Sequence, residues 1–344
     1  MKILVWALSL SLVGSCATKR YTEKLEDIRN SIAFENEALV VEYANTITSE
    51  ELKSIVYDIA SEEYQGRKTG ELGHNKLCKY LKNFYIDAGI ESPLGGDNYY
   101  QHVPKSSLSS GYNSTQNVVA YIKGSVYPDE LLVISSHSDH LGIENDIMYP
   151  GADDNGSGTA ALLEIAQAFK TAQSNGHGPK RSILFLHLTG EENGLYGSHY
   201  YTEHPIFPLD NTIANLNIDM IGRVDPKHET NPNYIYLIGA DRISTELHYV
   251  SEVANKQFTN LELDYTYNRE DDPNRYYYRS DHYNFALKGI PVIFYFNGEH
   301  KDYHKPTDTA EKLNYPLLET RSKLIFATAW YLVNSPKRLD PNKI

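Results

Sequence analysis

Runs of β-branched and other apolar residues alternate with helical periodicity through most of the chain, and this alternation limits the possible folds more than any other feature. The expected strands are QNVVAYI, LLVISS, SILFLHLT, ANLNID, YIYLIG and PVIFYF. Helical periodicity covers Leu72 to Ala88, Ser157 to Thr171 and a stretch near Ser244 to Asn255. Such alternation is typical of a mainly parallel sheet covered by helices. We therefore expect an α/β fold with a mixed, mostly parallel central β-sheet flanked by helices on both faces.

The start of the chain predicts export. A positively charged beginning precedes an apolar run from Ile3 to Val13, which is too short to span a bilayer. The run ends in LVGSC, which resembles the lipobox of bacterial lipoproteins, in which the signal is cut before Cys16 and this cysteine is acylated. Ordinary signal cleavage nearby is the alternative. We expect a signal peptide over residues 1–15, a polar tether over 16–45 and one domain over 46–344, held by lipid at Cys16 in the bacterial cell envelope.

Charge and cysteine content exclude some classes of function. The 45 acidic residues outnumber the 32 basic ones, and no run of Lys or Arg could follow a phosphate backbone. Nucleic acid is therefore not an expected partner. If Cys16 carries lipid, Cys78 is the one remaining cysteine, so no disulfide is expected.

TSEELKSIVYDIA has capping-box spacing between Thr48 and Glu51 ahead of helical periodicity.

Two polar clusters follow expected elements at positions where open α/β sheets bind ligands. HSDH follows LLVISS, so His137 would project from the carboxyl end of a strand, with Asp139 close enough to hydrogen-bond its imidazole. PGADDNGSG opens directly into an apolar helix and places Asp154 where its carboxylate could bridge two cations. Taken alone, HSDH is more typical of a surface loop, and the acidic turn could simply cap the helix.

Two further clusters carry carboxylates and a histidine. TGEENGLYGS follows SILFLHLT and contains the adjacent acids Glu191 and Glu192. Neighbouring acids in a confined cleft repel unless a cation or a proton intervenes, so one could bind metal while the other moves protons. Asp219 ends ANLNID, and His304 lies within DYHKPTDTAEKL. Each of these features alone is more typical of a solvated turn, a cap or a surface residue.

Together the clusters supply two histidines and four carboxylates, which suit paired zinc ions better than calcium or iron–sulfur chemistry. In this order, HSDH, GADDNGSG, EENGLYGS, NIDMIG and YHKPTDT resemble metallopeptidase family twenty-eight. That family includes bacterial leucyl aminopeptidases, glutamate carboxypeptidase II, glutaminyl cyclases and the transferrin receptor. The resemblance covers roughly Gly66 to Val333, including QGRKTG and RSDHYNFALKGIP.

The resemblance implies the zinc exopeptidase fold, peptide substrates and a centre of two zinc ions. The ligands that it implies are His137, Asp154, Glu192, Asp219 and His304. Asp154 matches the bridging ligand, and the peptide bond that follows it is expected to be cis. His137 and Asp219 would hold one zinc, and Glu192 and His304 the other.

The resemblance also implies the reacting groups. Glu191 matches the general base, and Tyr303 matches a tyrosine that donates a hydrogen bond to the oxyanion in some members. The interval from Ala88 to Gln116 is too short for the protease-associated domain that some members contain. The loop EDDPNRYYYRSDH is expected to line the cleft with its three tyrosines, with plain packing as the alternative.

We therefore expect a zinc-dependent aminopeptidase that removes single residues from the amino end of peptides. A glutaminyl cyclase, a carboxypeptidase or dipeptidase, and a non-catalytic surface binding protein remain as alternatives. Glutaminyl cyclases keep fewer ligands and usually replace the position that His137 supplies. The transferrin receptor has lost its ligands, whereas this sequence has a residue at every ligand position.

Overall fold

The computed structural model describes residues 21–342, so the expected signal peptide and Cys16 lie outside the described residues. Contacts divide the chain into two units, Met1–Glu35 and Asn36–Ile344. In the first unit, residues 21–31 are helical. In the second, α2 (Glu37–Ala44) contacts two other helices of the same unit, although it falls in the range expected to be a tether. The compact unit therefore begins at Asn36 rather than at residue 46.

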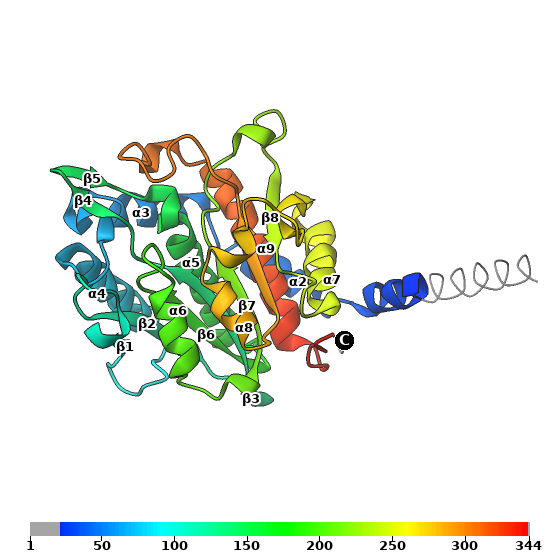
Figure 1. Ribbon diagram of the computed structural model, residues 1–344. Coiled ribbons are helices and arrows are strands. Elements are labelled where there is room, and N and C mark those ends of the chain that lie inside the picture. Colours follow the sequence, from blue (N-terminus) through cyan, green and yellow to red (C-terminus); the bar gives the residue numbers. More distant parts are fainter. Residues whose placement is uncertain (1–20, 343–344) are drawn as a thin grey trace, which may run out of the picture. The chain divides into compact units, whose positions relative to one another are not determined.

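An eight-stranded mixed sheet forms the centre of the second unit (Figure 1). In spatial order its strands are β1 (Tyr100–Val103), β2 (Thr115–Ile122), β6 (Arg181–Leu188), β3 (Tyr127–His137), β7 (Thr212–Ile218), β10 (Val292–Phe296), β8 (Tyr234–Ile238) and β9 (Glu262–Asp264). The inner strands β6, β3, β7 and β10 are parallel, and β9 is parallel to β8. The pairs β1 with β2, β2 with β6, and β8 with β10 are antiparallel. The expected mixed, mostly parallel sheet is confirmed.

Helices cover both faces of this sheet, which explains why its inner strands are apolar throughout (Figure 1). Every residue of β6, β7, β8 and β10 is buried, as expected for strands with no solvated face. The helices after α2 are α3 (Ser49–Ile59), α4 (Leu72–Asp87), α5 (Gly158–Ser174), α6 (Tyr196–Glu203), α7 (Thr245–Ala254), α8 (His282–Leu287) and α9 (Tyr315–Asn334). Helices α5 and α9 contact each other and the inner strands, while α6 contacts α8.

Local sequence signals explain where several elements begin. Thr48 caps α3: its side chain accepts a hydrogen bond from the backbone N–H of Glu51, and its hydroxyl donates to the Glu51 carboxylate. The helix cap expected from the spacing of Thr48 and Glu51 is therefore present. A two-stranded hairpin of β4 (Gly142–Glu144) and β5 (Ile147–Tyr149) separates the HSDH cluster from the acidic turn.

The parallel order of the inner strands brings distant residues to one edge of the sheet. His137 is the last residue of β3, while Glu191 and Asp219 lie just beyond the ends of β6 and β7. The register pairs Ser135 of β3 with Asn217 of β7, and His137 with Leu188 of β6, so these three strands end together.

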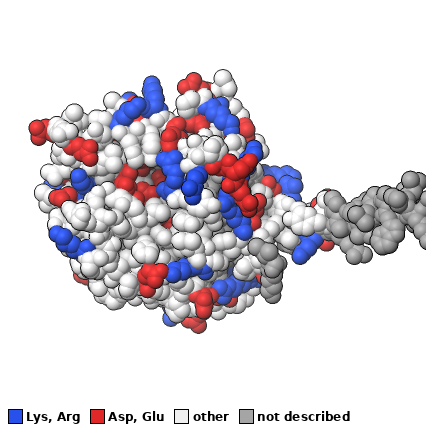
Figure 2. Space-filling model, in the orientation of Figure 1, with Lys and Arg blue, Asp and Glu red and all other residues white. Residues whose placement is uncertain are grey.

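Charged side chains of both signs are interspersed on the face shown in Figure 2, and they form no continuous basic band there. Within residues 21–342, no helix combines the length and apolar character needed to cross a membrane.

Candidate metal centre

Three of the five expected ligands meet at the carboxyl edge of the sheet. Nε2 of His137 lies 3.2 Å from Oδ1 of Asp219 and 3.4 Å from Oδ1 of Asp154. All three side chains are almost completely buried. One ligand atom from each of them lies within 4.8 Å of the other two, so the three can hold one ion.

The other two expected ligands meet on the opposite side of Asp154. Nε2 of His304 lies 3.0 Å from Oδ2 of Asp154 and 3.0 Å from Oε2 of Glu192. Asp154 therefore presents one oxygen to His137 and the other to His304. A carboxylate placed in this way can bridge two cations.

The backbone around Asp154 is fixed by contacts on two sides. The peptide bond from Asp154 to Asn155 is cis, as expected. The Asn155 amide donates to the carbonyl of Ile218, and its oxygen accepts from the backbone N–H of Met220, which ties the turn to the end of β7. The Asp308 carboxylate accepts from the backbone N–H of Asp154 at 3.1 Å.

Arg67, from the QGRKTG motif, joins the two loops that carry His137 and Asp154. Its buried guanidinium donates to the backbone carbonyls of Ser138, Pro150 and Gly151 at 3.2, 2.6 and 2.7 Å. Burial lowers the pKa of Arg67 to about 10, so it stays charged at neutral pH. Its fixed fork of donors holds the loops in one arrangement.

The adjacent acids Glu191 and Glu192 have different surroundings. Burial raises the pKa of Glu191 well above its usual value, and the nearby Asp219 and Glu192 carboxylates add to the rise although His137 opposes it. For Glu192, burial also opposes ionisation, but His140 and His304 hold its pKa below the usual value. Two neighbouring acids whose pKa values are displaced in opposite directions are suited to different chemical roles.

Asp139 contacts His137 differently from the sequence expectation. The backbone carbonyl of Asp139 lies 3.1 Å from Nδ1 of His137, whereas its carboxylate is 4.0 Å away. That carboxylate instead accepts from the Thr69 hydroxyl at 2.7 Å and from the backbone N–H of Glu191 at 3.2 Å. Asp139 thus orients the imidazole through its main chain and the Glu191 turn through its side chain.

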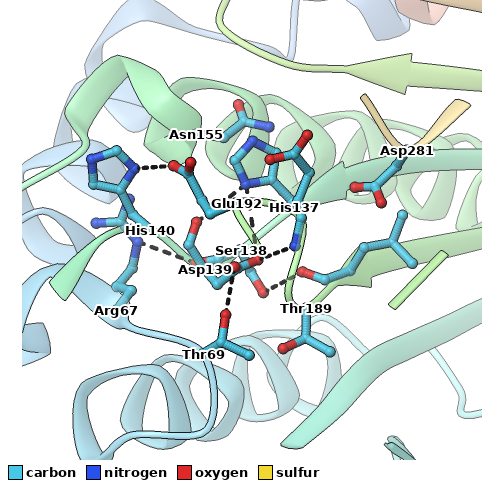
Figure 3. Close-up of polar contacts among 12 residues, drawn as sticks. Arg67, Thr69, His137, Ser138, Asp139, His140, Asn155, Thr189, Glu192 and Asp281 are labelled. Atoms are coloured by element: carbon cyan, nitrogen blue, oxygen red, sulfur yellow. Dashed lines mark hydrogen bonds and ion pairs between the residues drawn. The ribbon is translucent and has the colours of Figure 1, made fainter. Parts of the chain in front are cut away.

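His140, which sequence reasoning did not select, is also part of the cluster. Its Nδ1 lies 2.6 Å from Oε1 of Glu192 (Figure 3) and 3.8 Å from Oδ2 of Asp154. The one available signal was its place as the last residue of HSDH, next to Asp139. The motif did not indicate that its ring would turn toward a carboxylate on the loop after β6.

A cavity of about 240 Å³ opens from the carboxylates of the cluster. Its other walls are formed by Gly194, Leu195, Met220, Tyr276, Arg279, Phe294, Phe296, Glu299, Tyr303 and His304. Of the three consecutive tyrosines expected to line the cleft, Tyr276 does so, whereas Tyr277 and Tyr278 are not among the lining residues.

Tyr303 and Arg279 lie together in this wall. The Tyr303 ring stacks on His304 with ring centres 3.9 Å apart. The Arg279 guanidinium donates to the Tyr303 hydroxyl at 3.5 Å and pairs with Glu299 at 2.9 Å. Accepting a bond from arginine leaves the hydroxyl proton of Tyr303 available to another acceptor.

The donor set fits two zinc ions. Buried carboxylates crowded in this way repel one another unless cations balance them. Two ligands about 2.0–2.2 Å from a tetrahedral zinc are roughly 3.3–3.5 Å apart. The nitrogen–oxygen separations of 3.0–3.4 Å on the two sides of Asp154 are close to that spacing. Mixed imidazole and carboxylate ligands are also a common zinc set.

Comparisons with known proteins place this geometry in context. A protein-family model described as "Peptidase family M28" matches residues 117–329. A probable zinc metalloprotease of Pyricularia oryzae is 30% identical over 305 residues, which cover 76% of this chain and 58% of that protein. Aminopeptidase YwaD of Bacillus subtilis is 26% identical over 233 residues, covering 65% of this chain and 46% of that protein. The chain thus spans about half the length of these curated relatives.

Solved structures show the same fold. The LapA aminopeptidase of Legionella pneumophila superposes with a TM-score of 0.69 at 21% identity, covering 89% of this chain and 76% of that one. BSAP, a zinc aminopeptidase from Bacillus subtilis, gives 0.65 at 16% identity, covering 86% and 98%. A glutaminyl cyclase of Porphyromonas gingivalis also gives 0.65 at 16% identity, covering 82% and 98%. Enzymes of different activity therefore share this fold, and the fold alone does not select among them.

Proposed function

The chain belongs to peptidase family M28, and on that premise we propose that it is a two-zinc aminopeptidase that hydrolyses the first peptide bond of its substrates. The observation that carries this proposal is the position of Asp154 between two histidine-containing groups. Its two oxygens face His137 and His304 at 3.4 and 3.0 Å, and each group includes a further carboxylate, from Asp219 and Glu192 respectively. A chain that used this fold only for binding would have no need of such a ligand set.

A pair of zinc ions, when bound, polarises a carbonyl group and lowers the pKa of water. Five side chains would hold them: His137, Asp154, Glu192, Asp219 and His304. Glu191 lies beside these ligands but is not proposed to bind zinc. As general base, its carboxylate would take the proton of the attacking water and pass it to the leaving amine nitrogen. The Tyr303 hydroxyl would donate to the oxygen that becomes negative as the carbonyl is attacked.

The shape and charge of the cavity favour attack at a chain end. Its volume of about 240 Å³ is below the roughly 300–1,000 Å³ of typical small-molecule sites, which suits the side chain of one residue. Apolar walls from Met220, Phe294 and Phe296 suit an apolar side chain. Of the carboxylates that line the cavity, Glu191 and Glu299 are not among the expected zinc ligands and would attract a free α-ammonium group, whereas an internal peptide bond would lack this contact.

One observation favours a second candidate. Arg279 lines the cavity and could pair with a substrate carboxylate, which would suit a dipeptidase or a carboxypeptidase. Its pairing with Glu299 at 2.9 Å already supplies an acidic partner within the protein, which makes this function the weaker of the two.

The test combines zinc content with a panel of matched peptides. We expect about two zinc ions per chain and hydrolysis of peptides with a free amine, including those whose carboxyl end is amidated. Hydrolysis that needs a free carboxyl group and tolerates a blocked amine would favour the carboxypeptidase. Conversion of amino-terminal glutamine to a pyroglutamyl residue with release of ammonia, and without hydrolysis of a peptide bond, would favour the cyclase. A chain with neither zinc nor activity would contradict the proposal.

The Asp154→Ala variant tests the bridge itself. Both ions lose a shared anionic ligand, so zinc content and activity should fall together. Asp97→Ala is the matched control, because Asp97 is an exposed carboxylate remote from the cluster in sequence. Full zinc content and a normal rate in Asp154→Ala would exclude the two-zinc arrangement.

A further inference from the structure

His140 has an unusual set of contacts for a buried histidine. Its side chain is inaccessible to solvent, and its Nδ1 lies 2.6 Å from Oε1 of Glu192. Its other ring nitrogen, Nε2, is buried and has no hydrogen-bond partner among the described residues. A buried polar atom without a partner loses its hydrogen bonds to water and gains none in return, which destabilises the folded protein. An apolar ring would avoid this cost, so packing alone does not account for an imidazole here.

The backbone beside His140 leaves room for its ring. Gly151 has a φ of +56°, and a Cβ atom added there would lie 2.4 Å from Cδ2 of His140. Any side chain at position 151 would therefore collide with the imidazole. The glycine that opens the Asp154 turn thus allows His140 to approach Glu192.

The two oxygens of Glu192 have different partners. Oε1 faces His140 at 2.6 Å, and Oε2 faces His304 at 3.0 Å on the side of Asp154. An ionised carboxylate only accepts hydrogen bonds, so the contact with Oε1 requires a proton on Nδ1 of His140. His140 therefore occupies one oxygen and leaves the other directed toward the shared space between His304 and Asp154.

From this geometry we propose that His140 is a positioning residue that holds Glu192, and not the adjacent Glu191, in the orientation of a metal ligand. The inference rests on the zinc centre of the proposed function. Glu191 and Glu192 are adjacent in the chain, so a small change in the turn could bring the carboxylate of Glu191 to the metal in place of that of Glu192. The hydrogen bond from His140 fixes one of them and leaves Glu191 free to move a proton.

The experiment measures zinc affinity, without substrate, by competition with a coloured chelator. His140→Asn places an amide N–H close to the position of Nδ1 and should keep zinc affinity near that of the unmodified protein. His140→Ala removes the donor and should weaken the binding of one of two zinc ions by about 10- to 100-fold, the usual effect of removing a partner of a metal ligand. The unfolding temperature of each zinc-free variant shows whether it is folded.

His187 supplies a matched control. It is also buried, its Nε2 lies 2.7 Å from the Tyr85 hydroxyl, and its Nδ1 has no partner among the described residues. His187→Ala should leave zinc affinity unchanged, because this ring contacts none of the expected ligands.

Each outcome distinguishes the inference from the function on which it rests. Equal zinc affinity in His140→Ala and the unmodified protein would overturn the positioning role alone. An equal loss in His140→Asn and His140→Ala would overturn it as well, because the restored donor would then have no effect. Absence of zinc from the unmodified protein would overturn both the inference and the proposed function.

Discussion

Glu191 and Glu192 are neighbours in the chain, yet their carboxylates have different contacts. Glu192 lies between His140 and His304, whereas Glu191 is placed near His137 and Asp219. If Glu191 is the general base, Glu191→Gln keeps its shape and removes the proton acceptor. We expect zinc content to remain and turnover to fall by about 100- to 10,000-fold, with a much smaller change in substrate affinity. Steady-state kinetics and zinc analysis of the same preparation measure both.

Glu192→Gln is the paired control for that prediction. Removing a ligand should lower zinc content first and activity as a consequence. If zinc is lost from Glu191→Gln and kept in Glu192→Gln, the two roles are exchanged. If both variants hydrolyse peptides at the normal rate, the proposed mechanism is wrong.

Tyr303 tests the second reacting group. Tyr303 lines the cavity and its hydroxyl accepts a bond from Arg279, so its own proton is available to the substrate oxygen. Tyr303→Phe should lower kcat by about 10- to 1,000-fold if this hydroxyl meets the developing negative charge, with zinc affinity unchanged. Tyr278→Phe, which alters a tyrosine outside the cavity, should have little effect on kcat. An unchanged rate in Tyr303→Phe would reduce its role to stacking on His304.

Short motifs predicted which residues gather at the site, but not all of the contacts among them. Each expected ligand lies in the cluster because it follows a strand or a tight turn that the sequence marks clearly. The direction of a side chain depends on neighbours from other segments. His140 was therefore missed, since its partner comes from the loop after β6. The Asp139 carboxylate was assigned to His137, whereas Thr69, far away in sequence, bonds to it.

At the level of elements, burial decides how easily a segment is recognised. The inner strands are continuous apolar runs and were predicted close to their observed bounds. Helix α9 (Tyr315–Asn334) was not predicted, because it is buried on most sides and its sequence lacks the polar face that marks a surface helix. The short outer strands β1 and β9 also lack a distinct pattern.

The packing of α3 against α5 gives an element-scale prediction about pH. Burial raises the pKa of Glu164 on α5 to about 8, and the nearby Glu51 carboxylate adds to the rise. An unfolded glutamate has a pKa of about 4.3, so the folded protein holds this proton more tightly. The stabilising effect is complete below the unfolded value and is lost as pH rises toward 8. The slope in this window is at most about 1.4 kcal/mol per pH unit.

Glu164→Gln removes this dependence because the amide stays neutral. We expect the unfolding temperature of the variant to exceed that of the unmodified protein by a margin that grows from pH 5 to pH 8. Thermal unfolding with zinc present throughout measures the margin. Glu62→Gln, at an exposed glutamate after α3, is the control for loss of a surface carboxylate. A constant difference for Glu164→Gln would show that this carboxyl group does not titrate between these pH values.

At the scale of the whole molecule, the proposed lipid anchor predicts where the protein is found in the cell. The sequence LVGSC makes Cys16 the proposed acylation site. Cys16→Ser should therefore move the protein from the membrane fraction to soluble material, while its peptidase activity is unchanged. Cell fractionation followed by the peptide assay measures both, and Cys78→Ser is the control for loss of a thiol. Membrane retention of Cys16→Ser would exclude lipid attachment at this residue.

The spread of the expected ligands from His137 to His304 has a consequence for how the centre is assembled. Each ligand follows a different segment, and His304 comes only after the last inner strand has been added beside β7. A growing chain could not complete the proposed two-ion centre until more than 300 residues had been synthesised. The chain would then bind its full complement of metal only at the end of folding. Truncated or partly folded chains would then lack the proposed peptidase activity.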